Sequence, residues 1–190
     1  MRIVRPGFEH LDSYEATLRR GWFTERGRMD ADKASELLAR IEADPQAFLD
    51  RHDDPVGGGE PIVLEDGTHV PRLPSIRRWM WDGQYSGSIS VRYQPGTTDL
   101  PSYVLGHIGY DVVPWKRGRG YAKAALAQML PIARQVGLPF ADLVIDVTNT
   151  ASQHVTLANG GVLIREFVAP ESSGSFDALL FRIDLADDAG

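Results

Sequence analysis

The sequence predicts one α/β domain of the mixed α+β class, and three observations support this prediction. Apolar residues recur at helical spacing through most of residues 10–51. From residue 77 onward the spacing becomes that of extended chain, with one strand–helix–strand unit in the middle. A chain of 190 residues is long enough for one hydrophobic core and short for two. We therefore expect a single domain over residues 1–190.

The first part of the chain begins with a short strand and continues with helices and a loop. The turn pair Pro6–Gly7 ends the strand, and Leu11, Tyr14 and Leu18 keep the helical rhythm that follows. Pro45 interrupts the next helical stretch. The predicted elements are a strand at 2–5, a helix at 10–22, a helix from 30 to about 43, a second short helix reaching about 51, and a loop at 52–75 with a brief extended stretch at 62–64.

The second part of the chain combines strands with two helices. Asp82–Gly83 marks a hairpin-like turn between the first two of three neighbouring antiparallel strands. Gly106 and Gly109 in the third strand suggest a bulge or the close approach of another group, and Pro131 is expected to bend its helix. The predicted elements are strands at 77–83, 85–93 and 102–113, a helix at 119–136, a strand at 142–147, a helix at 149–161, and strands at 162–168 and 177–185.

Composition excludes several classes of function. The formal net charge of −6 argues against a general nucleic-acid partner, because such binding depends on lysine and arginine neutralising phosphates. The lack of cysteine excludes disulfides and a thiol nucleophile, and the histidines show no metal-ligand spacing, so we expect no metal. No apolar stretch has the length of a signal peptide or a membrane span, which predicts a cytoplasmic protein with no membrane partner.

Residues 114–126, PWKRGRGYAKAAL, are the most informative stretch. A strand ends before them and a helix begins within them, so backbone N–H groups at the helix start are available to an anion. Gly118 and Gly120 have no side chains to keep a ligand away, and Lys116, Arg117 and Arg119 add positive charge. The dinucleotide fingerprint and the nucleotide P-loop both fail to match. We therefore predict a phosphate or pyrophosphate site.

This stretch resembles the acetyl-CoA-binding signature of the GNAT family of N-acetyltransferases. The matching residues are Arg117-Gly118-Arg119-Gly120-Tyr121-Ala122, after a strand that ends Val112-Val113-Pro114. In that family the next strand leads to a short helix that opens with Asn and carries a small polar residue three positions on. Asn149 and Ser152 stand at those places, before the glycine pair 160–161. The order of the predicted elements matches the family from residue 2 to residue 185.

The resemblance implies a GNAT-like acyl-CoA N-acyltransferase fold, with a mostly antiparallel central sheet that is splayed at its middle and flanked by helices. Acetyl-CoA, as a co-substrate, would lie where the strands at 104–113 and 142–147 diverge. Residues 76–190 would form the sheet core with the acetyl-CoA cradle, and residues 1–75 would wall the acceptor side. The residues implied in binding acetyl-CoA are Val112, Val113, Arg117, Gly118, Arg119, Gly120, Tyr121, Ala122, Asn149 and Ser152.

Three residues of the central strand are candidates for catalysis. His107 is the first choice of general base, because histidine titrates near neutral pH and the family often places its base on this strand, and a hydrogen-bonded core residue is the alternative. Tyr110 and Asp111 are further candidates, one on each face of the strand. A backbone N–H near Val112 would hold the developing oxyanion. Where the family often carries a tyrosine acid, this chain has Thr156, a far poorer acid.

The resulting prediction is an N-acetyltransferase that moves an acetyl group from acetyl-CoA to a primary amine of an unidentified acceptor, a small molecule rather than a protein. The alternative, which the threonine at position 156 favours, is a non-catalytic acyl-CoA-binding or sensor module on the same fold. The pattern leaves open whether the protein is a monomer or a homodimer. It also leaves open whether Trp79 and Trp81 line the acceptor pocket or, as we expect, belong to the core.

Overall fold

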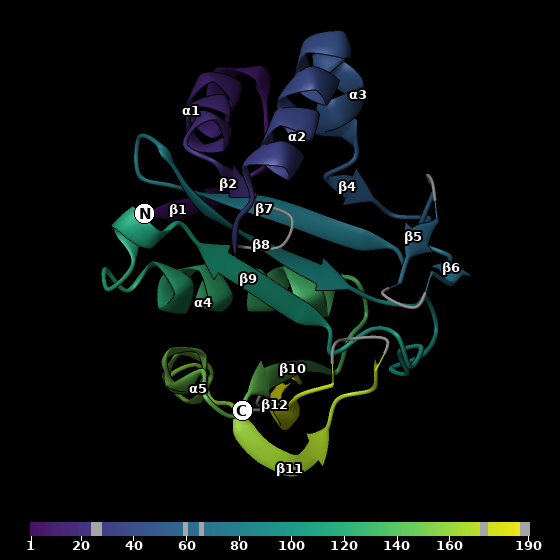
Figure 1. Ribbon diagram of the computed structural model, residues 1–190. Helices are drawn as coiled ribbons and strands as arrows, with labels where there is room; N and C mark the ends of the chain where they lie inside the picture. The colour runs from purple at the N-terminus through teal and green to yellow at the C-terminus, as the bar shows by residue number, and fades with distance from the viewer. Residues whose placement is uncertain (24–27, 59–60, 65–66, 172–174, 187–190) are drawn as a thin grey trace.

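The computed structural model describes residues 1–23, 28–58, 61–64, 67–171 and 175–186 (Figure 1). The elements of its first half are β1 (Arg2–Val4), α1 (Phe8–Arg19), β2 (Trp22–Phe23), β3 (Arg28–Met29), α2 (Ala31–Ala43), α3 (Pro45–Asp50), β4 (Asp53–Asp54), β5 (Ile62–Val63), β6 (His69–Val70), β7 (Ser75–Trp81) and β8 (Tyr85–Arg92). Those of the second half are β9 (Ile108–Val112), the 3₁₀ turn η1 (Pro114–Lys116), α4 (Tyr121–Gln135), β10 (Phe140–Asp146), α5 (Thr150–Leu157), β11 (Val162–Val168) and β12 (Asp177–Asp184).

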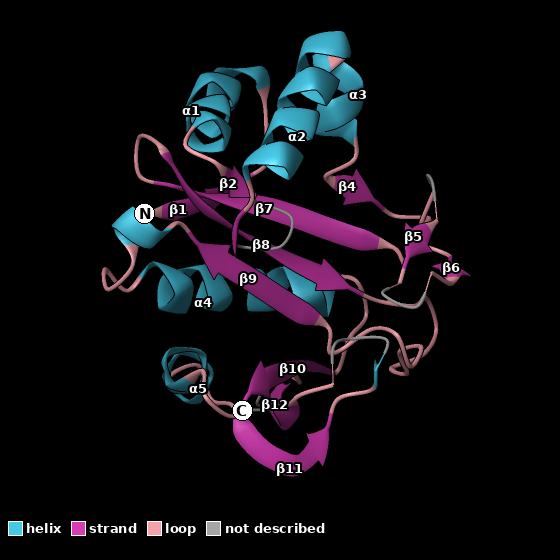
Figure 2. Cartoon of the chain, viewed as in Figure 1, coloured by secondary structure: helices cyan, strands magenta, loops and turns pink. Residues whose placement is uncertain are grey.

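Two antiparallel sheets lie next to each other in the middle of the molecule, the sheet that ends in β9 above the sheet that contains β10 in the view of Figure 2. The larger sheet has the strand order β1-β7-β8-β9, with β4 paired to the beginning of β7, and the smaller has the order β10-β12-β11. β9 and β10 approach each other at one bridge, between Gly106 and Leu143, and no ladder joins them elsewhere among the described residues. This is the mixed α/β fold with a central sheet splayed at its middle that the sequence predicts.

Helices cover both faces of the larger sheet (Figure 1). α4 packs on one face, where its Leu126 and Met129 join Ile89 and Val91 of β8 in the main core. α1, α2 and α3 cover the other face and form a second, aromatic core with it. Because side chains alternate along a strand, β8 presents apolar residues to α4 and polar ones to the opposite side. That polar side becomes the wall of the candidate site.

Trp79 and Trp81 belong to the aromatic core. The Trp79 side chain is 1% exposed and its ring stacks on Tyr14, with a centroid separation of 4.3 Å. Trp81 packs against the same cluster and meets His10 edge-on at 4.6 Å. The expectation that these two tryptophans form core is confirmed.

The predicted strand at 102–113 is too long, but the close approach of another group that was expected at its glycines is present. Gly106 has a φ of 80°, a left-handed conformation that breaks the strand, so that β9 begins at Ile108. A Cβ at position 106 would lie 2.8 Å from the carbonyl oxygen of Asp142, and one at Gly109 would lie 2.8 Å from Nη2 of Arg92. The groups that approach these glycines closely are therefore parts of the protein itself.

Other element boundaries also differ from the sequence expectation. α1 starts two residues earlier and ends at Arg19, and Trp22 lies in the hairpin β2–β3 instead of the helix. α4 begins at Tyr121 and continues through Pro131, so the proline does not end the helix early. The loop at 52–75 contains β4 and the hairpin β5–β6, and its residues 59–60 and 65–66 lie outside the described part of the chain. Short strands of this kind leave almost no periodic signal in a sequence.

The described helices include none that is long and apolar enough to cross a membrane.

Candidate active site

A cleft of about 1640 Å³ runs along the aromatic-core face of the larger sheet and past the edge of β9. Its walls are residues of α2, α3 and the loop that follows them, the strands β7, β8 and β9, the turn before α4, and α5. The cleft thus reaches the stretch 116–123 at one end and the loop 50–64 at the other. Such a volume is large enough for a ligand of cofactor size.

The start of α4 forms an open cradle of backbone N–H groups. Gly118 and Gly120 both have a φ of 74°, and a Cβ at either position would meet nothing within 4 Å. The first N–H groups of a helix have no partner within the helix, and here no side chain caps them either. The positive end of the helix dipole adds to their attraction for an anion. This geometry suits a phosphate group that approaches the backbone from the cleft.

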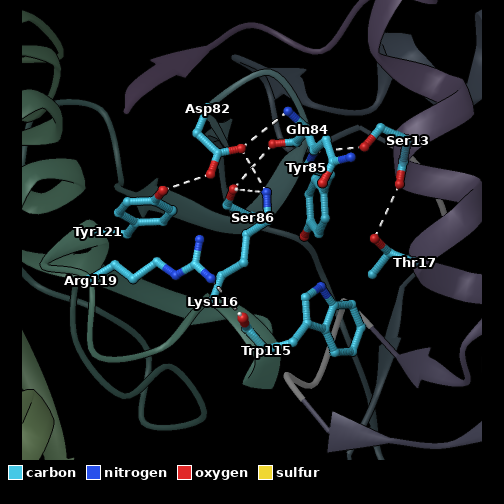
Figure 3. A network of polar contacts seen from close by, with 10 residues as sticks. All are labelled: Ser13, Thr17, Asp82, Gln84, Tyr85, Ser86, Trp115, Lys116, Arg119 and Tyr121. Carbon is cyan, nitrogen blue, oxygen red and sulfur yellow. Dashed lines mark hydrogen bonds and ion pairs between the residues drawn. The ribbon is translucent and has the colours of Figure 1, made fainter.

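The sequence analysis expected Lys116 to add a free positive charge to the cradle, and this expectation is wrong because the lysine is paired within the protein. Its buried Nζ donates to Oδ1 of Asp82 at 2.6 Å and to Oγ of Ser86 at 3.2 Å, and the Tyr121 hydroxyl donates to Oδ2 of Asp82 at 2.6 Å (Figure 3). Burial alone would raise the pKa of Asp82, but the hydrogen bonds from Lys116 and Tyr121 lower it to about 2. The network ties the β7–β8 hairpin to the turn before α4.

The two arginines of the cradle differ in position. Arg117 lines the cleft, and its Nε donates to the carbonyl oxygen of Val112 at 3.0 Å. Arg119 does not line the cleft, and its Nη2 donates to the carbonyl oxygen of Trp115 at 3.5 Å (Figure 3). Arg117 is therefore the cation of this turn that faces the cleft most directly.

The free edge of β9 faces the gap between the two sheets. The N–H of Arg92 donates to the oxygen of His107, and the N–H of Val113 donates to the oxygen of Ser86, so odd-numbered residues of this strand bond to β8. In an antiparallel ladder the alternate residues point their backbone groups outward. The backbone of Tyr110 and Val112 therefore faces the gap, where an extended ligand can pair with it as an additional strand would.

Asp111 has the most unusual environment in the cleft. Ser88 donates to its Oδ2 at 2.7 Å, and its Oδ1 is buried without a hydrogen-bond partner among the described residues. Burial raises the pKa of this carboxyl to about 6, against the opposing effects of Ser88 and the charge of Arg77. A carboxylate with this pKa is ionised at neutral pH and has a free oxygen that can accept a proton.

Two further buried polar atoms without hydrogen-bond partners lie near this carboxylate. They are the Tyr85 hydroxyl and the Trp22 indole nitrogen, within the described residues. Burial raises the pKa of Tyr85 well above its usual value, and the charge of Asp111 adds to this, while Trp22 is among the groups that lower the pKa of Asp111. Trp22 acts on Asp111, and Ser88 on Tyr85, as hydrogen-bonding groups, so the indole and the phenol belong to one buried polar cluster with Asp111.

Tyr110 lies on the opposite face of β9 and reaches α5. Its hydroxyl donates to the carbonyl oxygen of Ser152 at 3.4 Å, and the side chain lines the cleft. Burial raises its pKa, with opposing hydrogen bonds from Ser152 and Thr156. The hydroxyl of Thr156 is fully buried and donates to the same carbonyl oxygen at 2.9 Å. The phenol of Tyr110 therefore lies beside the position where the family often carries a tyrosine.

His107 joins the two sheets and does not line the cleft. Its backbone N–H donates to the carbonyl oxygen of Asp142 at 2.7 Å, and its Nδ1 accepts from the N–H of Asp142 at 3.0 Å. The side chain is 1% exposed, and burial lowers its pKa. This geometry matches the hydrogen-bonded core residue that the sequence analysis gave as the alternative to a catalytic base.

The cleft brings together most of the residues expected to bind acetyl-CoA. Val113 and Arg119 are the exceptions, since neither lines the cleft. Val113 is fully buried in the aromatic core. Asn149 uses its Oδ1 to cap α5 at the N–H of Ser152, 3.1 Å away, which leaves its NH₂ group for a ligand. The expected residues that line the cleft are Val112, Arg117, Gly118, Gly120, Tyr121, Ala122, Asn149 and Ser152.

Sequence reasoning missed the polar wall opposite α4. The residues of this wall that line the cleft are Arg77, Ser88, Ser90 and Arg92. Trp22 and Tyr85 belong to the adjoining aromatic core. The alternation in YSGSISVRY could have identified part of it, because Ser86, Ser88, Ser90 and Arg92 fall on one face of a strand. When both faces of a strand are covered by other elements, its polar side chains cannot face bulk solvent, so they indicate that the strand lines a cavity.

Comparison with known proteins agrees with this geometry. The family model of the acetyltransferase (GNAT) domain matches residues 68–162, half of the chain. No curated protein sequence matches it. The GNAT-family acetyltransferase from Streptococcus pneumoniae is 15% identical, with a TM-score of 0.59 over 97% of this chain and 98% of that chain. The microcin self-immunity acetyltransferase MccE, solved with acetyl-CoA and AMP, is 12% identical, with a TM-score of 0.59 over 96% and 91%.

The Salmonella typhimurium protein yncA, solved with acetyl-CoA, is 14% identical, with a TM-score of 0.52 over 99% of this chain and 95% of that chain. At these identities the structural likeness concerns the fold. The match to the family model covers the cradle, the free edge of β9 and α5. On this match, the chain belongs to the GNAT family of acetyltransferases.

Proposed function

We propose that this protein is an N-acetyltransferase that moves an acetyl group from acetyl-CoA to a primary amine of a small-molecule acceptor. Membership of the family supports acetyl transfer from acetyl-CoA. The observation that supports the enzyme most directly is the position of Asp111, whose unpaired carboxylate oxygen lies in the same cleft as the free edge of β9 and the cradle of α4.

The residues of the cleft fit acetyl-CoA along its length. The N–H groups that follow Gly118 and Gly120 would hold the pyrophosphate, with Arg117 adding its charge. The outward backbone groups of Val112 would pair with the pantetheine arm, and the NH₂ of Asn149 would hold the arm from α5. Arg119 would lie outside this contact set.

The two faces of β9 divide the chemistry between them. Acetyl-CoA supplies the acetyl thioester, and transfer releases its thiol. Asp111 would accept the proton of the acceptor ammonium, so that a neutral amine attacks, and the Val112 N–H would stabilise the developing oxyanion. As the C–N bond forms and the C–S bond breaks, the Tyr110 hydroxyl would donate its proton to the leaving sulfur. The Tyr110 phenol would thus replace the acid that Thr156 cannot provide.

The test measures CoA-thiol release and acetylated product over a panel of primary amines. We expect turnover by the wild type, and a fall in kcat of about 10²-fold for Tyr110→Phe with little change in acetyl-CoA binding, because the ring remains and only the acid is lost. Tyr103→Phe is the matched control, since Tyr103 also lines the cleft. Tight binding of acetyl-CoA without acceleration by any amine would contradict the enzyme and favour the sensor module instead.

A further inference from the structure

Two arginines face each other on the polar wall of the cleft. Arg77 comes from β7 and Arg92 from the end of β8, and both side chains line the cleft. In the ladder Arg77 is opposite Ser90, and Arg92 is opposite Ser75, two positions further along the same face. The guanidinium of Arg92 lies over the backbone of Gly109, where any larger residue would collide with it.

Neither arginine has an ion pair, or a hydrogen bond from its guanidinium, within the described residues. The Nε of Arg92 is buried without a partner. Burial and the charge of Arg77 lower the pKa of Arg92 to about 10. Two like charges that are partly removed from water are costly unless a counter-charge joins them.

Other partly or fully buried cations of the protein do have carboxylate partners. Arg78 pairs with Asp53, Lys116 with Asp82 and Arg182 with Asp142. Arg78 is the neighbour of Arg77 on the same strand, so the chain supplies an acid to one of these two adjacent arginines and leaves the other facing the cleft. The acid that acts on this pair is Asp111, whose charge interacts with that of Arg77 without forming an ion pair. One carboxylate beside two guanidinium groups leaves an excess of positive charge, which an anionic group of a ligand can balance.

The arginines lie at a suitable distance from the candidate base. The guanidinium of Arg92 lies over Gly109, which is two residues from Asp111 on β9. The charge of Arg77 is also close enough to lower the pKa of Asp111. Residues two apart on one strand face are separated by about 7 Å. An acceptor whose amine is at Asp111 can therefore place a group a few bonds away between the two guanidinium groups.

We propose that Arg77 and Arg92 form an anion subsite, and that the acceptor is an amine that carries a carboxylate or phosphate group. The proposal rests on the proposed function and narrows its substrate class. Guanidinium groups bind both kinds of anion with paired hydrogen bonds, so the chemistry is shared between amino acids and phosphorylated amines. Polyamines and neutral amino sugars would be poor acceptors.

The experiment compares kcat/KM for matched acceptors in the presence of acetyl-CoA. One pair is L-methionine and its amide, which differ in the carboxylate, and the other is 2-aminoethyl phosphate and 2-aminoethanol, which differ in the phosphate. We expect the charged member of one pair to be preferred by about ten- to a hundredfold. Which pair shows the preference distinguishes a carboxylate from a phosphate.

Arg77→Met and Arg92→Met should abolish that preference. The charge of Arg77 also lowers the pKa of Asp111, so the variants are compared at a pH well above the acid limb, where Asp111 stays ionised and the use of the neutral acceptors should be unchanged. Arg51→Met is the matched control, because Arg51 lines the same cleft but is exposed to solvent. We also expect neither variant of the pair to lower the melting temperature, since each removes an unpaired, partly buried charge. A purely structural role for these arginines would instead lower the melting temperature and reduce the use of all four acceptors equally.

The outcomes separate the two proposals. If no amine is acetylated, the proposed function fails. If amines are acetylated but the charged and neutral members of both pairs react equally well, the acetyltransferase stands and the anion subsite is wrong.

Discussion

At the scale of single residues, the proposed reaction depends on the ionisation state of Asp111. Ser88 donates to one of its oxygens, and the other is buried and unpaired among the described residues. An aspartate with an ordinary pKa, about 3.9, is ionised throughout the physiological pH range and is a weak base. Because burial raises the pKa of Asp111 to about 6, its ability to accept a proton falls within an accessible pH range.

We expect the acid limb of kcat/KM against pH to have an apparent pKa near 6. The carboxylate must be charged to accept a proton, so activity is present above this pH and is lost as the pH falls through it. Asp111→Asn should lower kcat/KM by about 10²- to 10⁴-fold. Ser88→Ala should move the limb to higher pH, because the Ser88 hydroxyl stabilises the charged form. A limb near pH 4 that Ser88→Ala leaves in place would contradict this role.

His107 provides a contrasting prediction, because its contacts are those of a structural residue. His107→Asn keeps an acceptor near Nδ1 for the N–H of Asp142, and His107→Leu removes it. We expect the leucine variant to be less stable than the asparagine variant by about 1–3 kcal/mol in denaturant unfolding. Both should keep their acid limb near pH 6. Loss of that limb in the asparagine variant would show that His107 is the base after all.

At the scale of elements, the start of α4 combines a left-handed glycine backbone with open space around it. Replacing Gly120 by leucine would place a side chain where the cradle needs access, and would strain the backbone by about 1–2 kcal/mol. Gly137, just after the same helix, also has a positive φ and open space around it, but does not line the cleft. Gly137→Leu is therefore a matched control for strain.

We expect Gly120→Leu to have a higher Kd for CoA than Gly137→Leu in titration calorimetry. The two variants should lose similar amounts of stability. Equal CoA affinities in the two variants would mean that the pyrophosphate binds elsewhere.

The pair Lys116–Asp82 joins the β7–β8 hairpin to the turn before α4, and its role is structural. Lys116→Met should destabilise the fold by about 1–2 kcal/mol, because Asp82 loses its ion pair and keeps only the hydrogen bond from Tyr121 on an exposed turn. The double variant Lys116→Met with Asp82→Asn should recover part of this loss in thermal unfolding. CoA affinity should change less than in Gly120→Leu. Additive losses in the double variant would show that the pair contributes little as a pair.

At the scale of the whole molecule, two cores share one sheet. The four tryptophans, Trp22, Trp79, Trp81 and Trp115, all belong to or pack against the aromatic core under α1–α3, whereas α4 and β10–β12 pack in the other. If the chain is the single domain that we predict, the sheet couples the two cores. Unfolding followed by tryptophan fluorescence and by far-ultraviolet circular dichroism should then coincide in denaturant. Separate midpoints would divide the chain into two folding units.

Long periodic segments and the cradle were predictable from the sequence, and the composition of the site wall was not. Helix α2 and strands β8 and β11 have patterns that extend over several turns or residue pairs, so their existence could be inferred. The glycines 118 and 120 marked the cradle because their chemistry is local. Of the two-residue strands, only β5 falls in a stretch that the sequence predicted as extended. Strands of this length are too short for a periodic pattern, and β4 is held by its pairing with β7, which is distant in the chain.

The sequence by itself determined the class of the fold, the family resemblance and the place of the anion cradle, since these depend on periodicity and on a contiguous motif. The tertiary structure decided which side chains face the cleft. It placed His107 between two sheets, and it gathered Asp111, Tyr85 and the arginines from separate strands onto one covered face. Burial and pairing are set by neighbours that are distant in the chain, so the order of residues alone could not reveal them. The same stretch, PWKRGRGYAKAAL, shows both limits: its glycines have the open, left-handed backbone that the predicted phosphate site needs, and its lysine is paired with Asp82.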